Sequence, residues 1–288
     1  MVRVEVYGDV RATCTQRVMI LLEELDLKYT VVPVDLTKGE HKSEEFRKLQ
    51  PFGKVPAVKY DDRILFESRS ILRYIAKNNQ DIKDLLGGVE ADVWLEAESQ
   101  NYNPPVSRIV NEKVFKKWRG ERADMDVIKT SVEELERVLD VYETRLSTVP
   151  FLGGEQFSIA DISHIPYTNY LLKCGYKNLF KDRPNVYRWL KKIIKRDSVQ
   201  YLVERDEVED GEIERNNEVK DQENKQSEHE KKDEKKDEGK DKKIDDKPSN
   251  KKTREAERGD KGQEHKVDMD DIVENLPKLE RKRRGGKA

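Results

Sequence analysis

Two adjacent polar residues, Glu67 and Ser68, stand immediately before an apolar-periodic run. The run contains Ile71, Leu72 and Ile75 at helical spacing, so it predicts a helix that begins at this polar step. A helix N-terminus presents unpaired backbone N–H groups and the positive end of the helix dipole, which suit a carboxylate or phosphate. The Glu67 carboxylate suits an ammonium group. The pair therefore predicts either a site for the zwitterionic end of an amino acid or, more simply, a serine that caps a helix.

The residues before this step form a turn and a hairpin that would position it. Residues 51–54 combine a proline with a glycine, the turn chemistry of a fixed φ followed by a permissive backbone. Residues 55–60 alternate sufficiently to form a strand, although Pro56 restricts that strand to an edge or marks a special peptide. Two aspartates then form a turn into a second strand at 63–66. The stretch predicts turn, strand, hairpin, strand and helix.

Charged residues are distributed unevenly along the 288 residues. From residue 205 onward the chain has 24 of its 57 Lys and Arg, 27 of its 59 Asp and Glu, and no aromatic residue. Residues 205–288 are therefore expected to form a disordered tail, because they cannot bury enough apolar surface to offset their ordering entropy. Residues 1–204 contain every aromatic residue and can bury a core.

Composition also excludes several classes of protein. Both parts of the chain are close to neutral, which argues against a primary role in binding nucleic acid. We expect no membrane segment or secretory signal, because no 18-residue apolar run exists and the N-terminus lacks an apolar core. Two cysteines, Cys14 and Cys174, form no disulfide framework and are typical of a reducing compartment. A cytoplasmic or nucleocytoplasmic protein follows.

The first 80 residues alternate strand and helix patterns. Strands are expected at 2–7 and 29–34 and helices at 14–25 and 43–49, before the hairpin and helix described above. A strand–helix–strand unit predicts a parallel pair with a right-handed crossover, and the hairpin extends the sheet antiparallel. We predict a thioredoxin-like α/β domain over residues 1–80.

Beyond a polar linker at 81–88, the pattern is helical throughout. The expected helices lie at 89–101, 107–117, 128–146 and 184–195, with another beginning at residue 158. Pro104 and Pro105 are expected to bend or interrupt the first long helix. Helices without strands predict a separate all-α domain over residues 89–204.

Ser158 and Asp161 have the spacing of a capping box at a helix start. Phe157 is expected to pack on Ile162 as a hydrophobic staple. We interpret Asp161 as structural and expect its replacement by alanine to destabilise the fold by ~1 kcal/mol through loss of the cap. His164, in the same helix, is expected to be a hydrogen-bonded core residue rather than a catalytic base.

Several strings, taken together and in order, resemble the plant phi class of glutathione transferases. They are QPFGKVPAV, LFESRSILRYIA, WLEAESQNYNPPVSRIV, VLDVYETRLS and FLGGEQFSIADISHIPYTNYL. They span both expected domains and leave out the tail. The resemblance implies a glutathione transferase fold, in which a thioredoxin-like domain precedes an all-α domain. It also implies a glutathione site on the first domain and an apolar acceptor site between the domains.

By position, the resemblance assigns the glutathione-binding residues. Glu67 and Ser68 would hold the γ-glutamyl amine and carboxylate, in agreement with the chemistry of the helix start. Val55 precedes a proline that is cis in this family and would offer backbone hydrogen bonds to the cysteinyl unit. His41 and Lys42 would reach the glycyl carboxylate.

At Lys54 the sequence departs from the family, which usually has glutamine there. A lysine still attracts a carboxylate, but it donates as a point charge and lacks an acceptor. Binding of glutathione is expected to survive with altered geometry. Arg69 is expected to support the site rather than to touch the ligand.

The main departure is at Ala12. The resemblance implies a serine at this position, whose hydroxyl lowers the pKa of the glutathione thiol by hydrogen-bonding the reactive thiolate. Alanine has no donor, and losing a hydrogen bond to a charged group costs roughly 1.5–3 kcal/mol. The Thr13 hydroxyl is a candidate substitute, Thr15 is a poorer one, and the backbone N–H groups at the helix start offer a further contribution.

Cys14 suggests a different reaction. Cysteine-using members of the superfamily place a thiolate in this loop, and helix N-termini lower thiol pKa values. Alignment of their Cys-x-x-x-Gln-Arg pattern, however, places the nucleophile at Ala12. We expect Cys14 to be a small inward-facing core residue, which disfavours a thiol reductase or dehydroascorbate reductase.

Two functions remain open. The first is conjugation of reduced glutathione to hydrophobic electrophiles, a detoxification reaction that proceeds by thiolate attack. The second is a ligandin that carries flavonoid-like aromatic molecules, because phi members with alanine at the serine position include carriers of flavonoid pigments. A minor third possibility is an interaction protein that retains the fold without the ligand.

The acceptor site is expected to be apolar with a few polar groups. Its candidate lining residues are Val10, Arg11, Leu36, Phe115, Trp118 and Tyr170. Arg11 would place a cation at the mouth and favour acidic or phenolate cargo. Spacing of Cys, His and Asp predicts no metal site.

The tail has two features of its own. Residues 267–279 place apolar side chains on one helical face, and residues 278–287 form a basic cluster of the nuclear-import type. Nuclear import and a fused or misassigned tail are both open hypotheses. The resemblance further implies a homodimer formed through the first domain of one subunit and the helical domain of the other.

Overall fold

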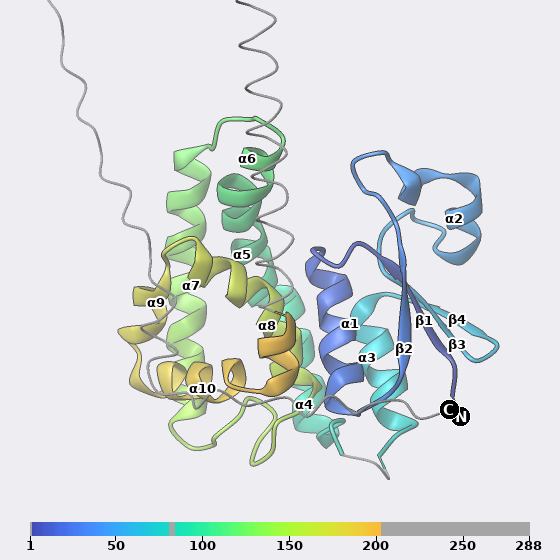
Figure 1. Ribbon diagram of the computed structural model, residues 1–288. Helices are drawn as coiled ribbons and strands as arrows, with labels where there is room; N and C mark the ends of the chain where they lie inside the picture. The colour runs from blue at the N-terminus through green and yellow to red at the C-terminus, as the bar shows by residue number, and fades with distance from the viewer. Residues whose placement is uncertain (1, 81–83, 203–288) are drawn as a thin grey trace, which may run out of the picture. The chain divides into compact units, whose positions relative to one another are not determined.

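A computed structural model describes residues 2–80 and 84–202 (Figure 1). The two features expected at 267–279 and 278–287, and the tail as a whole, lie outside these residues. The thioredoxin-like sheet followed by a helical domain confirms the predicted fold class.

Four short strands form one sheet in the first part of the chain. The strands are β1 (Val4–Gly8), β2 (Tyr29–Pro33), β3 (Ala57–Tyr60) and β4 (Arg63–Phe66). Their order is β2-β1-β3-β4, with β1 parallel to β2 and antiparallel to β3, and β3 antiparallel to β4. Val6 pairs with Val31 on one side and Val58 on the other, so the alternating valines of β1 lie at the centre of the sheet.

The helices of this domain are α1 (Thr13–Glu24), α2 (Glu44–Leu49), α3 (Ser68–Lys77) and the 3₁₀ turn η1 (Glu40–Lys42). Figure 1 shows α1 and α3 between the sheet and the helical domain, with α2 on the other side of the sheet. Residues Val18 to Leu22 of α1 are all fully buried, because the helix has the sheet on one side and α8 on the other.

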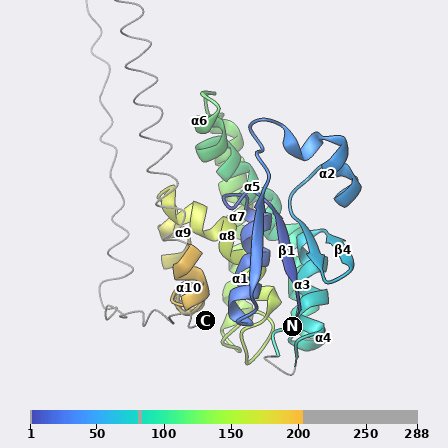
Figure 2. The ribbon, with the colours of Figure 1, turned by 45° about the vertical axis from the view of Figure 1, so that its right-hand side comes forward.

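The remaining helices form the second domain, as Figure 2 shows from another direction. They are α4 (Gly88–Ala97), α5 (Asn103–Val110), α6 (Lys116–Trp118), α7 (Met125–Leu146), α8 (Ile159–Lys173), α9 (Lys177–Lys181) and α10 (Pro184–Ile194). On α7, Leu135, Leu139, Tyr142 and Leu146 recur at helical spacing and are buried. Among the described residues, no helix is both long and apolar enough to cross a membrane.

The predicted effect of Pro104 and Pro105 is only partly correct. The chain stays helical through them, because a π-helical turn, η2 (Glu98–Tyr102), joins α4 to α5. The prolines occupy the first turn of α5, where a missing amide removes no α-helical hydrogen bond. A second π turn, η3 (Asn111–Phe115), joins α5 to α6. The interruption is therefore a change of hydrogen-bond register rather than a break.

Asp161 has a larger structural role than a helix cap. The capping box with Ser158 is present at the start of α8. The same carboxylate also accepts from the Leu152 amide (3.0 Å) and from the Trp189 indole N–H (2.8 Å). Asp161 is fully buried, and burial raises the pKa of its carboxyl although these hydrogen bonds oppose that effect. One carboxylate thus joins the 150s loop, α8 and α10.

We predict that Asp161→Ala lowers the free energy of unfolding by about 3 kcal/mol or more, because it leaves several buried donors unsatisfied. This exceeds the loss expected from a cap alone. Urea denaturation measures the change, with Asp62→Ala in the exposed β3–β4 turn as a matched control. A loss near that of a simple cap would show that the Leu152 and Trp189 bonds contribute little.

Candidate active site

The sheet register brings three of the predicted site segments to one end of the sheet. Tyr7 pairs with Ala57, and Ala57 pairs with Phe66. Three segments therefore meet at the same end of the sheet: the loop that follows β1, the residue pair before β3 and the residues after β4. Ala12, Val55 and Glu67 lie in these three segments, so tertiary structure assembles what the sequence separates by more than 40 residues.

Ser68 is the first residue of α3 and is held from inside the protein. Its side-chain oxygen accepts a hydrogen bond from Arg17 Nη1 at 2.9 Å, and only 5% of its surface is exposed. Because the oxygen is already an acceptor, the hydroxyl proton remains free to donate to an anion. A guanidinium and a helix N-terminus next to this hydroxyl both favour a carboxylate there.

Arg17 belongs to a buried ionic cluster that sequence reasoning missed. Its Nη2 lies 3.5 Å from Glu98 Oε1, and its Nε donates to the Ser163 carbonyl at 3.1 Å. Burial lowers the pKa of Arg17, but Glu98, Cys14 and Tyr167 together outweigh that effect and the net shift is upward. Arg69 Nε binds the other oxygen of Glu98 at 2.6 Å. The expectation that Arg69 supports the site agrees with this geometry.

A pattern in the sequence would have revealed Glu98. Ala91, Leu95, Glu98 and Tyr102 recur at three- and four-residue spacing, and all four are fully buried. A carboxylate on such an apolar stripe requires a cationic partner. The partner is Arg17, which directly precedes the buried run of α1. Neither residue resembles a ligand-binding motif by itself.

Glu67 has a strained backbone. Its φ of 64° and ψ of 101° lie outside the regions that non-glycine residues prefer, and its side chain makes no capping hydrogen bond. Strain of this kind is maintained where the surrounding structure fixes it, often at ligand clamps. The side chain is exposed at the start of α3, beside Ser68. The Glu67 carboxylate makes no capping hydrogen bond, so it is available to an ammonium group bound at this position.

The segment before β3 leaves a backbone edge available. The Val55–Pro56 peptide is cis, as the family resemblance implied. The paired strand begins only at Ala57, so Val55 lies outside the ladder. Lys54 is exposed, and its amide donates to the buried Gln50 side chain at 3.3 Å. The Lys54 ammonium is thus presented at the surface of a turn that Gln50 anchors.

His41 and Lys42 are placed against this turn from the other side. Lys42 Nζ donates to the Gly53 carbonyl at 2.6 Å. Gly53 has a φ of +59°, and a Cβ there would lie 2.7 Å from the His41 carbonyl oxygen, so this close approach requires glycine. Burial, and secondarily Lys42, lowers the pKa of His41. His41 Nδ1 is buried without a hydrogen-bond partner.

The start of α1 bears directly on thiol activation. Ala12 is the N-cap and supplies no side-chain hydrogen bond. Thr13 is the first helical residue rather than part of the loop, and it is 5% exposed. Its side chain lies near the Tyr167 phenol: burial raises the pKa of Tyr167, and Thr13 lowers it. Thr13 therefore faces Tyr167 on α8.

Cys14 differs from its predicted place in the core. It is partly exposed, and Arg17 Nη1 lies 3.5 Å from its sulfur. The difference arises because the inward positions of this turn are taken by Thr13, Thr15 and Gln16, which are buried. His164 is the core residue expected: it is fully buried and lies 2.9 Å from the Tyr142 hydroxyl and 2.7 Å from the Ala160 carbonyl.

Four of the six candidate acceptor-site residues come together. The rings of Phe115, Trp118 and Tyr170 have centroids 5.4–6.2 Å apart, and the Arg11 guanidinium lies 5.7 Å from the Trp118 ring. Arg11 does not present an isolated cation, because Asp9 accepts two hydrogen bonds from it at 2.8 and 3.1 Å. Val10 packs against the core, and Leu36 is partly exposed after β2.

Across residues 2–80 and 84–202, no group of His, Cys, Asp and Glu has the arrangement of a metal site.

Comparisons with known proteins identify the family. Models of the glutathione S-transferase N-terminal and C-terminal domains match residues 2–77 and 108–197. A probable glutathione S-transferase from Oryza sativa is 40% identical over 70% of this chain and 96% of its own length. Glutathione transferase F7 from Populus trichocarpa is 39% identical, with a TM-score of 0.68 over 70% of this chain and 98% of its own.

A maize glutathione S-transferase, crystallised with an atrazine glutathione conjugate, is 33% identical; its TM-score is 0.65 over 69% of this chain and 95% of its own. The chain belongs to the glutathione S-transferase family. Within that family it is a plant phi-class enzyme that uses glutathione as its co-substrate.

We predict that Ser68→Ala raises the dissociation constant for reduced glutathione roughly tenfold to a hundredfold, because a hydrogen bond to a charged group contributes about 1.5–3 kcal/mol. Isothermal titration calorimetry measures this change. Ser70→Ala, two residues further along α3 and exposed, is the matched control. If Ser68→Ala binds glutathione normally, its hydroxyl serves only Arg17.

Proposed function

We propose that the enzyme conjugates reduced glutathione to small hydrophobic electrophiles, as part of detoxification. In this reaction the thiol proton passes to solvent and the thiolate attacks an electrophilic carbon. A C–S bond forms while the bond from that carbon to its leaving group, such as a halide, breaks, and the leaving group departs with the bonding electron pair. The convergence of Val55, Glu67 and Ser68 with the start of α1 carries this proposal. The aromatic cluster around Trp118 supplies the apolar side, and the maize relative with its bound conjugate is consistent with such a reaction.

Each end of glutathione has complementary groups. The Glu67 carboxylate receives the γ-glutamyl ammonium, while Ser68 and the N-terminus of α3 receive the adjacent carboxylate. The Val55 backbone pairs with the cysteinyl unit outside the strand ladder. The glycyl carboxylate is received by His41 and Lys42 of the η1 turn and by Lys54 of the turn before β3.

Thiolate formation relies on the first turn of α1 rather than on a serine. Ala12 contributes no donor, and without a side-chain cap the first amides of the helix are available to the thiolate. We infer that these amides, together with the Thr13 hydroxyl, lower the pKa of the bound thiol. Tyr167 competes for that hydroxyl, so activation is weaker than a dedicated serine would give.

Separate substitutions at Ala12 and Thr13 test this account of thiolate formation. We predict that Ala12→Ser raises kcat/KM for a nitro-halobenzene about tenfold and lowers the pKa of the bound thiol by about one unit, because it adds a hydrogen bond to the thiolate. Thr13→Val, which keeps the shape and removes the donor, should lower kcat/KM by about tenfold. The pKa is read from thiolate absorbance against pH.

Unchanged kinetics in Thr13→Val would assign activation to the backbone amides alone. Loss of glutathione binding in either variant would contradict the separation of binding from activation.

A carrier function is the second candidate, and the absence of a hydroxyl at Ala12 favours it. A protein that activates the thiol weakly still binds aromatic ligands at the Phe115, Trp118 and Tyr170 cluster. No turnover by the wild type, with recovery in Ala12→Ser, would assign the protein to this role.

We also propose a two-fold homodimer in the cytoplasm. Apolar side chains are exposed on both domains. They are Phe52 in the turn before β3 and Ile64 on β4 in the first domain, and Val89 and Val93, about one turn apart on α4, in the helical domain. Phe52 is 65% exposed, and its ring makes a T-shaped contact with Phe66. Large exposed apolar side chains become buried when they lie in an interface. The basic segment 278–287 offers a route to the nucleus.

We predict that Phe52→Asp converts the dimer to monomer, because it places a charge at the centre of an apolar contact. Light scattering after size exclusion gives the mass directly. Val141→Asp, on the exposed side of α7, is the control for adding a charge at an exposed valine. A wild-type monomer would refute the dimer.

A further inference from the structure

Helix α10 and the two residues that follow it concentrate positive charge. From Pro184 to Arg196 the chain has five cations and no acidic residue. The cations are Arg188, Lys191, Lys192, Lys195 and Arg196. The opposite face of α10 buries Val186, Trp189, Leu190 and Ile193, so the helix is fixed and its cations are directed outward.

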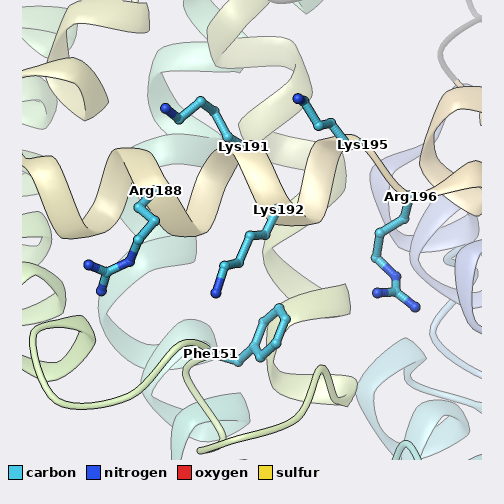
Figure 3. A pocket seen from close by; sticks show the side chains of 6 residues that line it. All are labelled: Phe151, Arg188, Lys191, Lys192, Lys195 and Arg196. Carbon is cyan, nitrogen blue, oxygen red and sulfur yellow. The ribbon is translucent and has the colours of Figure 1, made fainter. Parts of the chain in front are cut away.

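These cations surround a hollow with an aromatic ring in it. The hollow has a volume of about 510 Å³ and is lined by the five cations and Phe151. Figure 3 shows Arg188, Lys192 and Arg196 pointing to the side of α10 on which Phe151 lies, while Lys191 and Lys195 point the other way. Phe151 is partly buried and fixed by an edge contact to Phe157 at 5.9 Å.

Most of this charge is not neutralised by the described part of the protein. Arg196 is paired with Glu24 through two contacts of 2.5 and 2.6 Å. Arg188 donates to the Leu146 carbonyl, which carries no charge. Lys191 and Lys192 lie over the rings of Tyr187 and Phe151, at 4.7 and 5.3 Å.

Within residues 2–80 and 84–202, no carboxylate lies within ion-pair distance of Lys191, Lys192 or Lys195. Exposed arginines elsewhere do have such partners: Arg73 pairs with Asp92 and Glu96, for example. A cluster that lacks its own counter-charges is the arrangement expected where an external anion binds.

We propose that this hollow binds a small planar aromatic molecule that carries two or more anionic groups, such as sulfonates, carboxylates or phosphates. The volume lies in the range of small-molecule sites, roughly 300–1,000 Å³. Phe151 offers a ring to stack against, and Arg188 and Lys192, which point to the same side of α10, hold the anionic groups. An extended polyanion fits less well, because Arg188 to Arg196 spans only about 12 Å along the helix.

The hollow is distinct from the glutathione site. Arg196 reaches Glu24 at the last turn of α1, whereas Ala12 and Thr13 stand at its first turn. A helix of this length separates the two ends by about 18 Å. A ligand in the hollow therefore leaves glutathione in place, and the proposal holds whether or not the thiol is efficiently activated.

Fluorescence anisotropy of hydroxypyrene trisulfonate with the full-length protein tests the proposal. S-hexylglutathione is added at saturation to fill the catalytic site. We expect the probe to bind under these conditions, and Arg188→Gln/Lys192→Gln to weaken it roughly tenfold, since each exposed charge pair contributes modestly. Phe151→Leu should weaken it roughly threefold or more through loss of stacking.

The control variant removes the same charge elsewhere. Lys28→Gln/Lys129→Gln changes two exposed lysines elsewhere in the chain and should leave probe affinity unchanged. Thermal melting and glutathione affinity verify that each variant is folded.

Three outcomes would overturn the proposal. The first is displacement of the probe by S-hexylglutathione, and the second is an equal loss of affinity in the control variant. The third is normal affinity in Phe151→Leu combined with displacement by duplex DNA or anionic vesicles, which would indicate a general polyanion surface.

Discussion

The structure depends on one buried carboxylate, that of Glu98. It lies within ion-pair distance of Arg17 from α1 and Arg69 from α3, and Arg17 in turn holds Ser68 and the Ser163 carbonyl. Glu98 and Arg17 have no exposed side-chain surface, so neither charge is tolerable without the other. The cluster thereby joins the two domains where α3 begins. Two cations on one carboxylate also leave net positive charge beside the place where glutathione presents a carboxylate.

In the function we propose, glutathione binding and thiol activation depend on different parts of the fold. The groups proposed to recognise the peptide lie at the start of α3 and in the turn before β3, where buried contacts fix them. Activation is assigned to the start of α1, where Ala12 provides no donor and Thr13 faces Tyr167. Under this proposal, a single side-chain difference changes reactivity without disturbing the binding surface.

Local sequence patterns predicted much of this fold because burial imposes regular spacing. The inner face of α7, the capping box at Ser158 and the buried His164 all follow from apolar periodicity and helix-end chemistry. Predictions were less accurate where a residue has distant partners. Asp161 was assigned only a cap, because its bonds to Leu152 and Trp189 join segments that no local pattern connects. Pro104 and Pro105 were expected to bend or interrupt the helix, and the π turn that precedes them was not predicted because it depends on the packing around it.

By itself, the sequence determined that Ala12 offers no side-chain donor to a thiolate, since this follows from side-chain chemistry, and its resemblance to a known family supplied the proposed glutathione-binding residues. The sequence also located the helix start at Ser68. Only the tertiary structure decided that Arg17 and Glu98 hold that start in place, that Thr13 already faces Tyr167, and that the cations of α10 gather around Phe151. The physical reason is that charge pairing and shared hydrogen bonds are set by distances in space, whereas helical and strand periodicity is set by distances along the chain.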